Sequence, residues 1–176
     1  MIVLGIRPRT GSATVVLLGG TAAQPRLLDS RVLVLCDPDE EHSRQPYHAT
    51  FGVEQTDRAI IARLVKGVER ISRSAIKALL KEYEKGGHRP RRAVMVALSL
   101  TDPASIANQH MRAHASEGAL YRRVVIEALE RNGIKVSVLL EREVRVPPLV
   151  AQLGTDAPRW RAEEKRAAAA ALTLFR

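Results

Sequence analysis

Runs of apolar residues separated by polar turns divide the N-terminal part of the chain into short strand-like segments. Three such runs cover residues 2–6, 13–18 and 27–36. Each is short and rich in Val, Ile and Leu, and each is followed by Gly, Pro or charged residues, which is typical of β-strands. Strands joined by turns of a few residues pair most simply as an antiparallel meander. We therefore predict a three-stranded meander, with its first turn in residues 7–12.

The rest of the chain alternates between helix and strand patterns. Apolar residues recur every three or four positions from 54 to 85, which predicts a long helix. A second helix is predicted to start at a cap in residues 101–103 and to run to Arg131, because a capping side chain there precedes a first-turn proline. The remaining predictions are strands at 92–100 and 134–140, irregular chain at 154–158 and an alanine-rich terminal helix at 161–175.

The predicted order is βββαβαβα, which indicates an α/β fold. Its sheet is mixed and five-stranded: a three-strand meander followed by alternating helix and strand, with helices packed on it. We expect one domain over residues 1–176, because no linker or repeat divides a chain of this length. The polar segment 37–52 is a long loop, and such loops tend to be functional or mobile. Its two histidines, His42 and His48, have no neighbouring ligands at metal spacing, and we expect both to be solvated.

The amino-acid composition limits the classes of partner that the protein is expected to bind. Lys and Arg number 28 against 19 acidic residues, a net charge of +9, which favours a polyanionic partner. Aromatic residues make up only 3%, so base stacking on aromatic platforms has little support. The lone Cys36 excludes an internal disulfide and a multi-cysteine zinc site. No apolar stretch is long enough to span a membrane and the start of the chain has no basic leader, so we expect a cytoplasmic protein.

Five cations follow one face of the predicted 54–85 helix. At about 100° per residue they lie within about 80° of one another. Glu69 and Glu84 lie off this line and do not neutralise it. The stripe is either a solvated helix face or a surface that follows phosphates. Its members are Lys66, Arg70, Arg73, Lys77 and Lys81.

Several segments resemble the RuvC-type Holliday-junction resolvases of the ribonuclease H-like superfamily. Residues 5–9 read Gly-Ile-Arg-Pro-Arg where that family opens with Gly-Ile-Asp-Pro-Gly. The resemblance extends over most of the chain outside 37–52. It also rests on residues 77–83 before the strand at 94–97, on 113–128 followed by 133–136, and on 143–145 and 162–165. It implies a nucleic-acid-binding protein of that fold, with DNA favoured as partner and a branched form included.

The same resemblance implies a nuclease site that this sequence has altered. Nucleases of this fold hold two divalent cations with three or four carboxylates. Arg7 stands at the first of these positions and Ala97 at the second. In the terminal helix Glu163 or Glu164 could substitute in part, although Arg166 is the closer match.

The first, second and fourth predicted strands contain no acid, and Asp29 and Asp102 are the nearest carboxylates along the chain. A standard two-metal site is therefore expected to be lost. Arg7 and Arg9 are then either inert turn residues or phosphate ligands at the former metal site.

A second constellation lies on the predicted 101–131 helix. His110, His114, Glu117 and Tyr121 are spaced to form one line along it. Such a set can ligate a transition metal, supply an acid and a base, contact nucleic acid, or be purely structural. All four interpretations stay open from sequence, and we predict no resident metal or other cofactor.

Three functions follow. The first is a RuvC-like protein without two-metal nuclease activity, which binds phosphates through Arg7, Arg9, Lys66, Arg70, Arg73, Lys77 and Lys81. The second is a Mg²⁺- or Mn²⁺-dependent nuclease with a rearranged site drawn from Glu117, Glu163, Glu164, His110 and His114. The third is an interaction module of a larger complex. A protein assembly or a homodimer is compatible with each, and none places the chain in a membrane.

Overall fold

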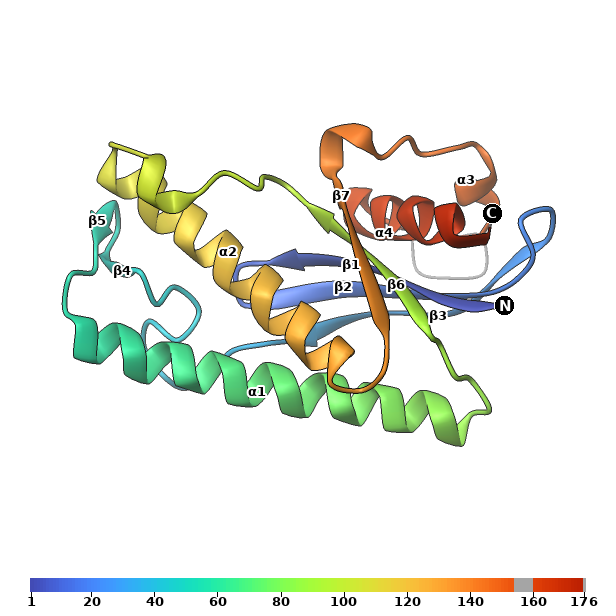
Figure 1. Cartoon of the computed structure of the whole chain (residues 1–176), viewed down its shortest axis with the longest axis horizontal. Helices are drawn as coiled ribbons and strands as arrows, with labels where there is room; N and C mark the ends of the chain where they lie inside the picture. The colour runs from blue at the N-terminus through green and yellow to red at the C-terminus, as the bar shows by residue number, and fades with distance from the viewer. Residues whose placement is uncertain (154–159, 176) are drawn as a thin grey trace.

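The computed structural model describes residues 1–153 and 160–175. Five strands form one sheet in the order β3-β2-β1-β6-β7 (Figure 1). The first three strands are antiparallel, whereas β6 runs parallel to β1 and β7 parallel to β6. Their bounds are β1 Ile2–Arg9, β2 Ser12–Gly20, β3 Pro25–Val34, β6 Arg92–Ala97 and β7 Lys135–Leu140. The predicted mixed sheet, with its meander and parallel strands, is confirmed.

Helices cover both faces of the sheet. The long helices α1 (Arg58–Lys85) and α2 (Gln109–Glu130) lie on one face, and α4 (Ala162–Leu172) lies on the other (Figure 1). The shorter elements are β4 His48–Thr50, β5 Val53–Glu54, α3 Leu149–Leu153 and the 3₁₀ turns η1 Pro103–Ser105, η2 Glu141–Glu143 and η3 Thr173–Phe175. The irregular stretch predicted at 154–158 lies outside the described residues. In the part of the chain that is described, no helix is both long and apolar enough to span a bilayer.

The core has two layers because strand side chains alternate between the faces. Leu4 and Ile6 of β1 pack toward α1 and α2, whereas Val3 packs with α4. Gly5 sits under α4 so closely that a Cβ there would lie 1.8 Å from the Ala167 carbonyl oxygen. The buried alanines of α4 and this glycine bring the helix onto the sheet.

The turn predicted at residues 7–12 is wrong in its first half. β1 continues to Arg9, where Arg7 pairs with Thr14 and Arg9 with Ser12. Pro8 is tolerated inside the strand because β6 pairs with β1 only as far as Ile6, which leaves the next residues on a local edge. The two arginines are therefore held in a strand rather than in a turn.

The predicted start of the second long helix is also wrong. The Asp102 side chain accepts a hydrogen bond from the Ala104 N–H at 3.0 Å, but it caps only the short turn η1. The helix itself begins at Gln109, where the Asn108 side chain accepts from the Met111 N–H at 3.0 Å. One capping side chain can start a turn, but the sequence pattern does not say whether the turn continues.

Candidate nucleic-acid interface

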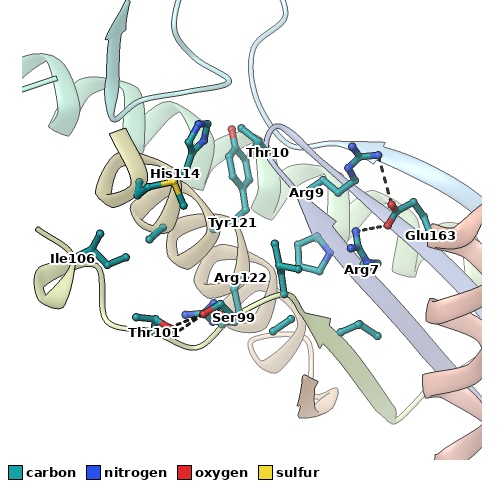
Figure 2. A pocket seen from close by; sticks show the side chains of 17 residues that line it. Arg7, Arg9, Thr10, Ser99, Thr101, Ile106, His114, Tyr121, Arg122 and Glu163 are labelled. Carbon is teal, nitrogen blue, oxygen red and sulfur yellow. Dashed lines mark hydrogen bonds and ion pairs between the residues drawn. The ribbon is translucent and has the colours of Figure 1, made fainter. Parts of the chain in front are cut away.

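A cleft of about 650 Å³ opens where the parallel strands β1 and β6 end beside α2. The strand ends supply one wall and α2 supplies the other (Figure 2). In open α/β sheets, ligands bind at the carboxyl ends of the parallel strands, so this is the expected place for a site. The residues that line it include Arg7, Arg9, Ala97, His114, Arg122 and Glu163.

Arg7 lies between two carboxylates at this edge. Its guanidinium forms ion pairs with Glu141, directly after β7, and with Glu163, in the first turn of α4. The Arg7 side chain is only 12% exposed. Arg166 lies 3.2 Å from Glu141, and Arg9 lies 3.7 Å from Glu163. Three guanidinium groups therefore share two carboxylates, and the network carries a net positive charge.

These carboxylates are not the acids that lie nearest along the chain. Asp29 and Asp102 are not the acids beside Arg7: Asp29 accepts from the Tyr83 hydroxyl at 2.6 Å, and Asp102 caps η1. The acid that sequence reasoning missed is Glu141. The available signal was its place directly after the last predicted strand, because parallel strands end at the same edge of a sheet.

The other acid considered in α4 has a different task. Glu164 accepts a hydrogen bond from the Arg161 N–H at 2.8 Å and caps the start of the helix.

Across the cleft, Arg122 donates to the Ser99 carbonyl at 2.8 Å, and burial lowers the pKa of its guanidinium. Arg9, with a side chain 60% exposed, is the most accessible of the cations discussed in the cleft.

The basic stripe of α1 lies apart from this cleft. All five of its members are exposed, and none lines the cleft. The structure therefore divides the seven predicted nucleic-acid contacts into two surfaces. Arg7 and Arg9 belong to the cleft, while Lys66, Arg70, Arg73, Lys77 and Lys81 stay on the outer face of α1.

Histidines gather where β4 meets the first turns of α2. His48 Nδ1 lies 2.7 Å from Glu117 Oε1, and His48 Nε2 lies 3.4 Å from His110 Nδ1. His110 Nε2 in turn lies 3.3 Å from His114 Nε2. Burial raises the pKa of the Glu117 carboxyl, and the neighbouring His48 opposes the shift. Burial and the His48 and His110 rings lower the pKa of His114.

The expectation that His48 is solvated is wrong, because only 5% of the residue is exposed. The segment before α1 is anchored on α2 rather than free. The Tyr121 hydroxyl donates to the Arg44 carbonyl at 2.9 Å, and Glu54 accepts from Arg112 at 2.6 and 2.9 Å. His42 is exposed, as predicted. No local sequence pattern links His48 to a helix that begins about 60 residues later, so only the tertiary fold reveals this contact.

The candidates for a rearranged nuclease site fall into separate groups. Glu163 is paired with Arg7 and Glu164 caps α4, whereas Glu117 and His110 belong to the histidine cluster. His114 and Glu163 both line the cleft but stand on opposite sides of it (Figure 2). Within the described residues, these side chains do not converge on one point.

No protein-family model matches this sequence, and no curated protein sequence matches it. The fold does have similar solved structures. RuvC of T. thermophilus in complex with a Holliday junction substrate superposes with a TM-score of 0.64 at 16% identity, covering 99% of this chain and 93% of that one. A second structure of Thermus thermophilus RuvC gives 0.61 at 16% identity, with coverage of 99% and 94%. The chain has the RuvC fold. The resemblance noted in the sequence is thus confirmed for the architecture.

Proposed function

We propose that this protein binds nucleic acid in the cleft at the ends of β1 and β6 and does not cut it by a two-metal mechanism. The observation that carries the proposal is the Arg7 guanidinium paired with Glu141 and Glu163 at the carboxyl ends of the parallel strands. A fixed positive charge stands where the nuclease resemblance calls for metal-binding acids. DNA is the favoured partner, and a branched form is the first to test.

Charge supports the binding half of this proposal. The exposed Arg9 guanidinium can reach a phosphate without leaving a buried acid unpaired. The whole chain carries +9, which adds a favourable long-range field for a polyanion. The RuvC of T. thermophilus that shares this fold was solved with a Holliday junction substrate.

The chemistry of the side chains supports the second part of the proposal, the absence of two-metal cleavage. A two-metal site needs several carboxylates that are free to coordinate divalent cations. Here Glu141 and Glu163 are neutralised by arginine, and Ala97 offers no ligand at the end of β6. A dication at this place would also be repelled by Arg7, Arg9 and Arg166. The residues present therefore do not fit a pair of divalent metals.

The interface can be mapped by measuring fluorescence anisotropy of a labelled four-way DNA junction and a labelled duplex. We expect R9Q to weaken binding to both and to reduce the slope of log K against log salt by about 1, since one phosphate contact is lost. The matched control is R26Q, because Arg26 is exposed in β3 at the opposite end of the sheet. R26Q should bind like the wild type.

The stripe on α1 is tested separately with the K66Q/R70Q/R73Q/K77Q variant. A large loss in this variant with none in R9Q would contradict the cleft as the interface and favour the outer face of α1. Failure of the wild type to bind any nucleic acid at low salt, together with a stable protein partner in pull-downs, would select the interaction module instead.

A further inference from the structure

Glu117 organises the histidine cluster from inside the protein. It is fully buried, and its Oε1 lies 2.7 Å from His48 Nδ1. A carboxylate only accepts hydrogen bonds, so this contact places the His48 proton on Nδ1. The other ring nitrogen, Nε2, is then left with a free lone pair and lies on the far side of the ring from Glu117.

The second oxygen of the Glu117 carboxylate lies near another histidine. Glu117 Oε2 lies 3.7 Å from His114 Nδ1 and has no hydrogen-bond partner of normal geometry among the described residues. A small rotation of the His114 ring would close that contact and free its Nε2 in the same way. Carboxylates that fix the tautomer of a histidine from behind are the usual support of metal-binding imidazoles.

Nitrogens of neighbouring rings in this cluster lie, pair by pair, at the spacing that a metal requires. Two nitrogens that ligate one tetrahedral zinc lie about 3.3 Å apart, given the usual Zn–N distance. His48 Nε2 lies 3.4 Å from His110 Nδ1, and His110 Nε2 lies 3.3 Å from His114 Nε2. These two contacts use different nitrogens of His110, so a single ion can take only one of them. With one nitrogen from each ring, the three nitrogens lie within 4.8 Å of one another, and small ring rotations would bring them to the zinc spacing. Two imidazole rings this close stabilise each other little unless a proton or a cation lies between their nitrogens.

We propose that His48, His110 and His114 bind one zinc ion, with Glu117 as the residue that positions His48 and His114. His110 and His114 supply ligands one turn apart on α2, and His48 supplies the third from β4. Three imidazoles leave the fourth tetrahedral position for water or another ligand. The His114 side chain is 44% exposed and lines the cleft, so the metal would lie at the cleft wall and be reachable from solvent.

The site is new relative to the proposed function and does not depend on it. The expected two-metal position of a nuclease is at Arg7, on the other side of the cleft from His114 (Figure 2). Imidazole donors also suit zinc rather than magnesium, which prefers oxygen ligands. The consequence in the fold would be to fasten the β4 segment to α2.

The test is zinc binding by the full chain, purified without a histidine tag and stripped with a chelator. Competition with a chromophoric chelator should show one zinc per chain in the wild type, and Co²⁺ should give the visible spectrum of a tetrahedral site. The H110A/H114A variant should lose more than about a hundredfold in affinity, because both changes remove ligands. Both side chains are at least partly exposed, so this variant should keep its fold, which circular dichroism will check.

The chain contains its own control. His42 and His88 lie outside the cluster, and H42N/H88N removes the same number of histidines. Asn suits residue 42 because its φ of +63° lies in the left-handed region that Asn tolerates. Zinc retained in this control and lost in H110A/H114A supports the site. No stoichiometric zinc in the wild type, or equal affinity in the two double variants, overturns it.

Glu117 has its own test. E117Q keeps the size of the side chain but removes the negative charge of the carboxylate. It also leaves one acceptor oxygen in place of the two that could face the ring N–H groups of His48 and His114. We expect zinc affinity to fall about 10–100-fold, as for other residues that support metal ligands. Rescue by E117D would distinguish a charge effect from a packing effect, and an unchanged affinity in E117Q would overturn the role given to Glu117.

Discussion

In the proposed function, Arg7 determines how the cleft works. Its guanidinium supplies the positive charge that Glu141 and Glu163 would otherwise share with a metal ion. Because it is a covalent part of β1, this charge cannot move with a reacting phosphate or hold an attacking water in the way a metal does. Under this proposal, an arginine at residue 7 favours binding over hydrolysis.

The replacement can be reversed by the R7D variant. This change places a third carboxylate near Glu141 and Glu163 and removes their counter-charge, so the variant should be less stable in EDTA than the wild type. Mn²⁺ at about a hundredfold over its Kd should then raise Tm by about 5 °C or more. The wild type should show no such rise.

The matched control for this prediction is R26D, which makes the same charge change at the opposite end of the sheet. Thermal melts of all three proteins in EDTA and in Mn²⁺ are compared. An equal rise in R26D would indicate a general ionic effect. A rise in the wild type would contradict the account of Arg7.

At the scale of elements, periodicity predicted most of the fold. The apolar runs and the helical repeat located all five strands of the main sheet and the three longer helices, because burial on one or two faces leaves a pattern in the sequence. The pattern could not predict that β1 runs on to Arg9, since pairing beyond Ile6 depends on β2 alone. It also could not predict the buried His48, whose partners come from α2.

The candidate site was predictable only in part, for the same reason. Arg7 and Ala97 could be placed because the resemblance identifies a metal-binding position at each, near or at the end of its strand. Glu141 contacts Arg7 across 134 positions of sequence, so its role appears only once β7 is placed beside β6. Ion pairs between distant segments leave no local pattern.

Packing of α4 on the sheet depends on the absence of a side chain at residue 5. We expect G5A to destabilise the protein by about 3 kcal/mol, because its Cβ would meet the backbone of Ala167 and push the helix away. G118A is the control: a Cβ at this position of α2 meets nothing within 4 Å, and the helix should gain up to about 1 kcal/mol. Urea unfolding of both variants measures the difference, and similar values for the two would refute this packing.

The contact between β3 and α1 should depend on pH in the alkaline range. Tyr83 is buried and donates to Asp29 at 2.6 Å. Burial and this hydrogen bond raise its pKa above the ordinary value. The folded state thus holds the phenolic proton longer than the unfolded state. The stabilisation is complete below about pH 10, the ordinary pKa, and is lost as the pH rises above it.

We therefore expect Y83F to lower the free energy of unfolding by about 1.5–3 kcal/mol at pH 8, the usual value of a hydrogen bond to a charged group. The gap between wild type and Y83F should shrink above about pH 10. Urea unfolding at several pH values between 8 and 11 measures it. A gap that stays constant or widens across this range would exclude Tyr83 as the origin.

At the scale of the whole molecule, the described residues place two basic surfaces and a histidine cluster on the RuvC fold. The cleft gathers Arg7, Arg9 and Arg122, and the basic stripe occupies the outer face of α1. A polyanion longer than the cleft could contact both surfaces, whereas a short one would occupy only the cleft. The architecture is that of RuvC, while the charge at the strand ends is of the opposite sign to that of a metal-binding site.

One measurement tests this central claim most directly. The wild-type protein is incubated with a labelled four-way DNA junction in EDTA and in Mn²⁺ at matched ionic strength, and both binding and strand cleavage are followed. We predict the same Kd in the two conditions, because arginine rather than metal supplies the positive charge, and intact strands throughout. Metal-dependent cleavage of the junction, or binding that requires the metal, would contradict the account.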